Sequence, residues 1–186
     1  MQVKATFNAE KTQGWVKPNG LNAQVNVQNL FGSPAQNRRV EGEITLRPAL
    51  PSFAGYPDYT FRSRNENREG LNEELPEQTS NEQGDAVFDL NLDRRIDGTY
   101  QLRFLCRAYE QGSGRNVAAQ ASVMVSPEDF LVGIKADGDL DYVERGAARN
   151  LNLVAVDPEL RKTGADKLKL VIKEKKYLSV LTKDQY

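Results

Sequence analysis

The chain has 186 residues, of which 39% are hydrophobic and 27% charged, a balance typical of a soluble globular protein and not of a disordered or membrane-spanning one. Lysine and arginine together number 25 and aspartate and glutamate 26, so the net charge is −1 and no concentrated basic face for nucleic acid is expected. Histidine is absent, which removes the usual general base, the commonest zinc ligand and the Ser-His-Asp and Cys-His arrangements.

Apolar and polar residues alternate in short blocks along residues 1–125, and each block predicts a half-buried β-strand. The first block, Met1 to Phe7, lacks the basic and apolar segments of a signal peptide. Five more apolar faces follow: Leu21 to Val27, Val40 to Leu46, Ala86 to Leu92, Tyr100 to Ala108 and Val117 to Val125. Asp97-Gly98, between two of these strands, predicts a β-hairpin. No stretch keeps a helical period, so the predicted fold is all-β, with two packed antiparallel sheets of about seven strands.

Residues 48–85 interrupt this rhythm with a Pro-Ser-Phe-Ala-Gly-Tyr-Pro segment and a long polar run. Tyr59 to Phe61 is the one short strand expected inside it, and the remainder is predicted to be a surface loop. Such a loop exceeds the about 12–15 residues usual for an unstructured connection. Two interpretations stay open: a mobile or family-specific decoration, and a binding site.

After Val125-Ser126-Pro127 the strand pattern starts again. The new apolar faces are Phe130 to Ala136, Leu151 to Ala155, Leu168 to Ile172 and a last stretch from Tyr177 to Leu181. We therefore predict a first domain over residues 1–127 and a second over 128–186, with the boundary at Ser126-Pro-Glu128.

The two domains share a pattern when the chain is shifted by 127–128 residues. The correspondences, in order, are Trp15-Val-Lys-Pro-Asn-Gly20 with Tyr142-Val-Glu-Arg-Gly146, Ala23, Val25 and Val27 with Leu151, Leu153 and Ala155, Gly32-Ser-Pro34 with Asp157-Pro158, and Val40 and Ile44 with Leu168 and Ile172. We expect the aromatic ring to cap one end of a sandwich, while the glycine permits the reversal into the next strand. The sequence thus predicts one complete sandwich and the N-terminal half of a second, a piece of a larger protein. Two unrelated β-domains with common turn chemistry are the alternative.

No residue is predicted to be catalytic, to bind a cofactor or to hold a metal. Cys106 is the only cysteine and lies on the apolar face of its strand, which is typical of a small core residue. Asp137-Gly-Asp-Leu-Asp141 resembles the opening of a calcium loop, but Tyr142 and Ala148 occupy the positions where an EF-hand needs glycine and glutamate. An acidic hairpin loop accounts for this segment. The carboxylates of residues 67–74 lie in the predicted loop without a scaffold to fix their separation.

Several stretches resemble the tandem macroglobulin-like domains of bacterial alpha-2-macroglobulin proteins. They are Gln28-Asn-Leu-Phe-Gly-Ser-Pro-Ala-Gln-Asn-Arg-Arg-Val-Glu-Gly-Glu-Ile-Thr-Leu46, the run from Thr79 to Leu92, and Ile134 to Tyr142 with Ala155-Val-Asp-Pro158. The likeness covers nearly the whole chain outside the long loop, and Lys135-Ala-Asp-Gly-Asp-Leu140 is its most specific part. It implies tandem sandwiches of Ig/fibronectin-type architecture within a large periplasmic, envelope-associated protein. The family's thioester motif, Cys-Gly-Glu-Gln, is absent, because Cys106 is followed by Arg-Ala-Tyr.

The resemblance implies a parent protein that inhibits or traps proteases which cut an exposed bait segment. This chain would then be a non-catalytic structural and interaction piece without a cofactor. Its expected partners are neighbouring domains of the same polypeptide, proteases and envelope proteins, with no nucleic acid and no small-molecule substrate. The alternative is a β-sandwich repeat of a surface adhesin or carbohydrate-binding protein, which requires a row of exposed aromatic side chains. An enzyme that uses the loop carboxylates ranks last.

Overall fold

The computed structural model describes residues 1–10, 12–62, 69–93, 95–112, 114–140, 143–144, 146–165, 168–169 and 171. In this part of the chain the strands are β1 (Gln2–Phe7), β2 (Asn22–Gln28), β3 (Arg39–Pro48), β4 (Thr60–Phe61), β5 (Leu71–Thr79), β6 (Asp85–Asp89), β7 (Tyr100–Tyr109), β8 (Asn116–Val125), β9 (Leu131–Ala136) and β10 (Leu151–Val156). No helix occurs among the described residues, and all pairings between these strands are antiparallel. The predicted all-β, antiparallel fold is confirmed.

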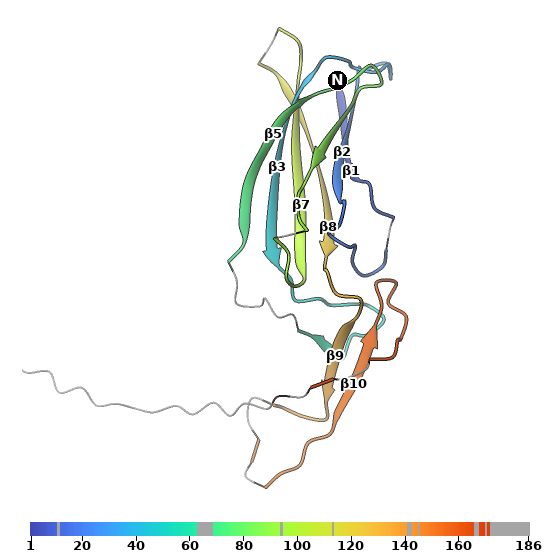
Figure 1. The fold of residues 1–186 in the computed structure, drawn as a ribbon, viewed down its shortest axis with the longest axis vertical. Helices are drawn as coiled ribbons and strands as arrows, with labels where there is room; N and C mark the ends of the chain where they lie inside the picture. Colours follow the sequence, from blue (N-terminus) through green and yellow to red (C-terminus); the bar gives the residue numbers. More distant parts are fainter. Residues whose placement is uncertain are drawn as a thin grey trace, which may run out of the picture.

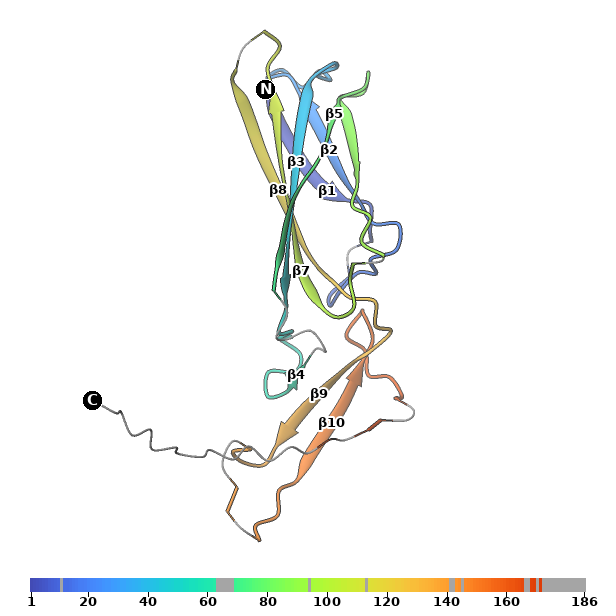
Figure 2. The same cartoon turned by 60° about the vertical axis from the view of Figure 1, so that its left-hand side comes forward.

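Seven strands form two sheets, which pack as a sandwich in the upper part of Figures 1 and 2. One sheet has the strand order β5-β3-β7-β8 and the other the order β1-β2-β6. Buried inward residues alternate with partly exposed outward ones along the central strands; in β3, for example, Val40, Ile44 and Leu46 are buried. This period of two is what the sequence pattern predicted.

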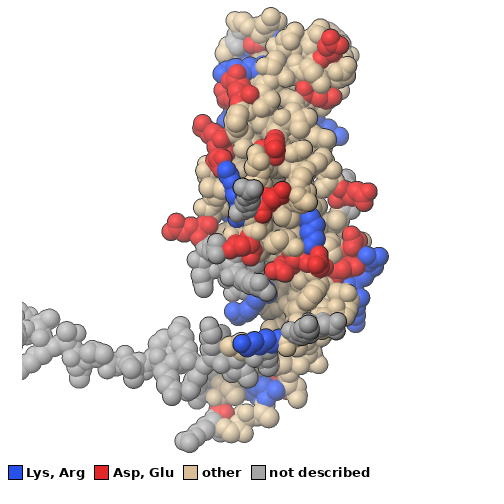
Figure 3. Space-filling view, viewed as in Figure 1, with Lys and Arg blue, Asp and Glu red and all other residues tan. Residues whose placement is uncertain are grey.

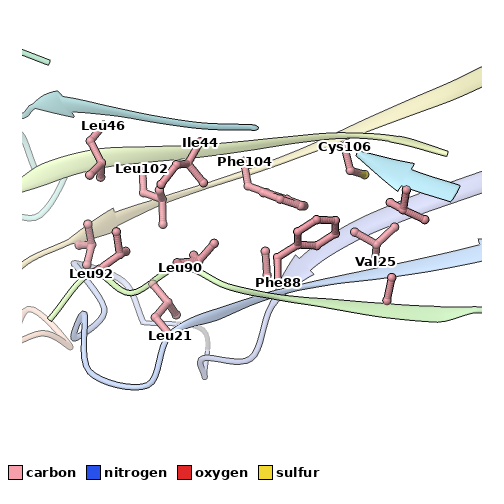
Figure 4. Close-up of a cluster of buried hydrophobic side chains, with 14 of the residues drawn as sticks. Leu21, Val25, Ile44, Leu46, Phe88, Leu90, Leu92, Leu102, Phe104 and Cys106 are labelled. Atoms are coloured by element: carbon pink, nitrogen blue, oxygen red, sulfur yellow. The ribbon is translucent and has the colours of Figure 1, made fainter. Parts of the chain in front are cut away.

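The core of this sandwich lies between the two sheets (Figure 4). Phe88 of β6 and Phe104 of β7 face each other across it, with ring centroids 5.3 Å apart. A methyl group on Gly42 would lie 2.8 Å from Cε1 of Phe88, so only glycine fits beneath the two rings. Cys106 is fully buried in the same core, and burial raises the pKa of its thiol. Its predicted role as a small core residue is confirmed.

Two details of the predicted sandwich were wrong. The first is the surface loop over residues 48–85, because β5 occupies Leu71–Thr79 and pairs with β3. This strand is at the sheet edge and most of its exposed residues are polar, so it lacks the apolar alternation of a half-buried strand. Pro76 lies where the register between Val40 and Gly42 shifts, a position where an edge strand tolerates the missing N–H.

The second is the hairpin at Asp97-Gly98. The strands on its two sides, β6 and β7, belong to different sheets, so residues 90–99 cross from one layer to the other. Leu90, Leu92 and Ile96 are buried along this crossover, which makes it part of the core and not a tight turn. Gly98 does not have the positive φ that a type I′ hairpin turn requires.

A second, smaller sheet has the order β10-β9-β4 and lies below the sandwich (Figures 1 and 2). Its central pair is the hairpin-like β9–β10, which follows the sandwich in sequence. Its third strand, β4, comes from the segment between β3 and β5, and Thr60 and Phe61 pair with Ile134 and Gly133. The first module therefore contributes a strand to the sheet of the second.

The repeat is visible in the described residues. Strands β1–β2 and β9–β10 both form antiparallel pairs. The burial of the predicted counterparts differs, because Val25 is buried whereas Leu153 is 47% exposed. Three of the predicted elements of the second copy lie outside the described residues: the aromatic turn at Tyr142, the strand residue Ile172 and the stretch from Tyr177 to Leu181.

Candidate functional site at the module junction

Trp15 lies at the lower end of the sandwich, where the chain turns between β1 and β2. Its side chain is fully buried, and its Nε1–H donates to the carbonyl oxygen of Glu128 at 3.0 Å. The next residue, Val16, bridges to the end of β8: its N–H donates to Met124, and its carbonyl accepts from Ser126 at 3.0 Å. The predicted aromatic cap is therefore present, and it packs on the connection to the second module.

A strap, which we define as residues 49–62, leaves the end of β3 and runs along this junction before it becomes β4. Two successive turns shape it, because the N–H of Tyr56 donates to Phe53 at 2.8 Å and that of Tyr59 donates to Tyr56 at 3.1 Å. The aromatic rings of the strap stack edge to face: the centroids of Phe53 and Phe61 are 4.9 Å apart, and those of Tyr56 and Phe61 are 6.2 Å apart. This segment is a built part of the structure and not a surface decoration.

The strap and Trp15 cover one face of the β9–β10 pair. We call the resulting apolar group the junction cluster; its buried members are Trp15, Phe53, Phe61, Leu131, Val154 and Val156. Fully burying one large apolar side chain stabilises a fold by about 1.5–3 kcal/mol, so a cluster of this size joins the modules firmly. A methyl group on Gly133 would lie 2.8 Å from Cζ of Phe61, which shows how closely β4 and its ring pack on β9.

Polar contacts fix the same junction at the turn after β10. The phenolic O–H of Tyr56 donates to the carbonyl oxygen of Leu160 at 2.9 Å, and the N–H of Gly14 donates to that of Pro158 at 2.9 Å. A Cβ atom on Gly14 would come within 2.8 Å of the same Pro158 oxygen, so the approach of the two backbones depends on glycine.

Two exposed ion pairs flank the cluster. The ammonium of Lys17 donates to Asp129 at 2.7 Å, and this hydrogen bond and charge lower the pKa of the Asp129 carboxyl. Lys135 donates to Asp58 of the strap at 2.8 Å, and this contact raises the pKa of the lysine. Exposed pairs of this kind contribute little free energy, so they fix orientation more than they stabilise.

The acidic segments that the sequence singled out are not brought together into a site. The side chain of Asp137 accepts hydrogen bonds from the backbone N–H and the side-chain amide of Asn150 at 3.0 and 2.9 Å, as in an ordinary loop. Glu73 of β5 pairs with Arg95. In the described ranges no group of three or more His, Cys, Asp or Glu side chains is arranged to hold a metal ion.

The surface carries charges of both signs. On the face shown in Figure 3, acidic and basic side chains are both present over the sandwich, and the acidic ones predominate. For the part of the chain that the structure describes, no helix has the length and apolar character needed to cross a membrane.

Comparison with known families decides the identity of the sandwich. Residues 3–127 match the family model described as the bacterial alpha-2-macroglobulin MG5 domain. The chain belongs to the bacterial alpha-2-macroglobulin family. An alpha-2-macroglobulin homolog of Yersinia pestis is 53% identical over 183 residues, which cover 98% of this chain and 9% of the relative. The alpha-2-macroglobulin of Pasteurella multocida is 40% identical over 185 residues, 98% of this chain and 10% of the relative. The chain thus spans about a tenth of the length of these curated relatives.

Solved alpha-2-macroglobulin structures have the same fold. The native conformation of the Escherichia coli protein matches with a TM-score of 0.62 at 20% identity, over 87% of this chain and 11% of that one. A Salmonella mutant, Y1175G, matches with a TM-score of 0.60 at 19% identity, also over 87% of this chain and 11% of that one. The Escherichia coli protein activated by porcine elastase matches with a TM-score of 0.58 at 21% identity, over 85% of this chain and 14% of that one. At these identities the likeness concerns the fold.

Sequence reasoning placed Trp15 correctly but missed the strap. The available signal was the unusual density of aromatic residues between Phe53 and Phe61, in a segment otherwise read as surface loop. Four aromatic rings in a stretch this short need a buried partner. Their partner is one face of β9, a strand that belongs to the second module.

Proposed function

We propose that this chain is a non-catalytic structural module of an alpha-2-macroglobulin that inhibits or traps proteases in the cell envelope. In this proposal residues 1–127 are one macroglobulin-like domain and residues 128–186 belong to the next. The localisation is periplasmic, and membrane attachment, where present, comes through another part of the polypeptide. The partners are neighbouring domains of the same chain, together with proteases and envelope proteins.

The observation that supports this proposal is that the aromatic side chains at the end of the sandwich are buried at the module junction and are not exposed to a ligand. Trp15, Tyr56 and Phe61 pack between the first module and the second sheet and hold the two together. Carbohydrate binding would need a row of exposed aromatic rings, whereas among the described aromatic residues only Phe31 is exposed. A scaffold that keeps successive domains in fixed orientation fits a large protein which responds as a whole to cleavage.

Limited proteolysis of the full-length protein tests the proposed role. We expect cleavage by an added protease to change the sedimentation of the protein and to leave the protease associated with it, inactive on large substrates and active on small ones. The control is the same protein incubated with protease that has been inactivated beforehand. Digestion that yields only free fragments and a fully active, unbound protease would contradict the proposal.

A further inference from the structure

The turn after β2 and the turn after β10 are the same structure, repeated at a spacing of 128 residues. An isolated bridge joins Gln28 to Pro34 in the first and Val156 to Lys162 in the second. Inside the first turn, the N–H of Asn29 donates to Ser33 at 2.8 Å; inside the second, the N–H of Asp157 donates to Arg161 at 3.0 Å.

The backbone conformation within the two turns agrees as well. Gly32 has a φ of 84° and Leu160, which occupies the equivalent place, has a φ of 62°. The left-handed conformation is costly for leucine and not for glycine, so the contacts around Leu160 must hold it in this conformation. We name the two segments turn A (residues 29–34) and turn B (residues 157–162).

Turn B is a docked element. The first module holds its backbone through the N–H of Gly14 and the phenol of Tyr56, which donate to the carbonyl oxygens of Pro158 and Leu160. The side chain of Leu160 packs against the junction cluster. One macroglobulin-like module thus receives the next by binding this turn.

Turn A lies at the opposite end of the sandwich, beside the N-terminus (Figures 1 and 2). Its apolar side chains are exposed to solvent. Leu30 is 70% exposed and Phe31 is 100% exposed, although both are large apolar side chains. In the described part of the chain, no hydrogen bond ends on the carbonyl oxygens of Leu30 or Gly32, the equivalents of those that turn B uses.

A hollow of about 500 Å³ adjoins turn A, lined by Leu30 and Phe31 together with Met1, Arg38 and Gln111. The Nε atom of Arg38 is buried here and has no hydrogen-bond partner among the described residues. Another nitrogen of the same guanidinium, Nη1, donates to Oε1 of Gln111 at 3.2 Å, and Gln111 also lines the hollow.

We propose that turn A is the docking surface for a preceding macroglobulin-like module of the same polypeptide. That module binds it as the first module binds turn B, with a backbone N–H and an aromatic strap. The inference rests on the proposed function, because it requires a longer chain of such modules. The curated relatives, of which this chain spans 9–10%, have the length for them.

Site-specific photocrosslinking in the full-length protein tests this contact. With Phe31→p-benzoylphenylalanine we expect a crosslink inside one polypeptide, mapped by peptide mass spectrometry to residues that precede Met1 of this chain. The same replacement at Val87, which is 51% exposed on the outer face of β6, is the control and is expected to give none there. A crosslinked dimer would show that turn A binds a second copy. That result, a crosslink elsewhere or no crosslink at all would overturn the proposal.

A melting experiment adds an energetic readout. The double substitution Leu30→Asp with Phe31→Asp should lower the midpoint of the transition in which this module melts within the full-length protein, by about 2–4 °C for each kcal/mol of docking energy lost from a cooperative unit of about 150–250 residues. It should leave the 186-residue chain unchanged, since both side chains are exposed there. Leu50→Asp is the matched control, because Leu50 is also 70% exposed and lies at the other end of the sandwich. Equal effects on both proteins would contradict docking.

The docking proposal and the proposed protease role can fail separately. Protease retention without the crosslink would contradict only the docking proposal, and the crosslink without protease retention would contradict only the protease role.

Discussion

At the scale of single residues, Gly133 decides how closely the strap approaches the second module. A methyl group there would lie 2.8 Å from Cζ and 2.9 Å from Cε1 of Phe61, and 3.1 Å from Cβ of Tyr59. We predict that Gly133→Ala lowers the free energy of unfolding by about 1–3 kcal/mol, the usual cost of overpacking a filled site. Urea denaturation followed by far-UV circular dichroism measures the change.

Gly55 provides the matched control for this substitution. It lies in the same strap, its φ is not positive, and a methyl group there would meet no atom within 4 Å. Gly55→Ala should therefore leave stability unchanged or raise it by less than about 1 kcal/mol, because it only restricts the unfolded chain. If the two substitutions act alike, β4 does not pack on β9 as described.

Trp15 makes the junction observable. It is the only tryptophan of the chain and its side chain is fully buried in the junction cluster. Tryptophan emission shifts to longer wavelength when the ring meets water, whereas circular dichroism reports all strands together. Fluorescence therefore follows the junction separately from the sandwich core around Phe88 and Phe104.

At the scale of elements, the strap depends on one directed hydrogen bond. The hydroxyl of Tyr56 donates to the carbonyl oxygen of Leu160 at 2.9 Å, across the gap between the modules. We predict that Tyr56→Phe costs about 0.5–1.5 kcal/mol, the net value of a typical intramolecular hydrogen bond. The loss should appear as a lower urea midpoint of Trp15 fluorescence.

Tyr59→Phe is the matched control, since the described residues include no hydrogen-bond partner for the hydroxyl of Tyr59. It removes the same atom from the same strap and should leave the midpoint unchanged. An equal fall for both variants would mean that the bond to Leu160 does not hold the strap.

The central strands could be predicted from the sequence because each carries its own signal. Apolar and other residues alternate from Val40 to Leu46 and from Tyr100 to Ala108. These segments are the inner strands β3 and β7, which are buried on one face and partly exposed to solvent on the other. The edge strand β5 has no such signal, because its polar residues face water on both sides of a sheet margin. The alternation of apolar and polar residues therefore identifies a strand only when one of its faces is buried.

The junction could be predicted only in part, for a related reason. Trp15 was recognised from its glycine turn and the repeat, which are local features. The pairing of Phe61 with Gly133 joins residues far apart in sequence, and no local pattern encodes it. The sequence predicted the wrong buried face of β9–β10. Leu131, Val154 and Val156, which pack in the junction cluster, lie on the opposite face, so both faces of this pair carry apolar residues.

At the scale of the whole molecule, acid should weaken the polar contacts of the junction slightly, because two carboxylates beside it have lowered pKa values. Asp129 has its pKa lowered by the hydrogen bond and charge of Lys17. For Asp157 of turn B, burial raises the pKa, but hydrogen bonds from the backbone and side chain of Arg161 outweigh it and the pKa is lowered. A lowered folded-state pKa gives stability that is present above the ordinary aspartate value of 3.8 and is lost as the pH falls through the folded value.

We therefore predict that the urea midpoint of Trp15 fluorescence falls slightly as the pH falls below 3.8, while circular dichroism at the same pH without urea still reports folded strands. Asp129→Asn and Asp157→Asn each remove one titrating group and should flatten the pH dependence of this midpoint over this range. Because Asp129 belongs to an exposed ion pair, high salt should also weaken its part of the dependence. Identical acid profiles for the variants and the unaltered chain would assign the transition to other groups.

The two modules are also coupled through the strap, and this coupling has a direct test. A two-stranded hairpin is marginal in water on its own, so β9–β10 depends on what covers it. Replacement of residues 52–61 by glycine and serine would remove β4 and every strap ring from the junction cluster. We predict that the backbone amides of β9 and β10 then exchange with deuterium as fast as an unfolded chain, while those of β3 and β7 stay protected, as hydrogen-exchange mass spectrometry would record.

The control for this replacement is the pair Leu30→Ser with Phe31→Ser in the same 186-residue chain. These two residues are exposed at the far end of the sandwich and should alter no protection in β9 or β10. Persistence of slow exchange in β9–β10 without the strap would show that the second module holds itself together. Slow exchange only when the strap is present means that the first module completes the second, so successive modules of such a protein reorient as linked pairs and not one by one.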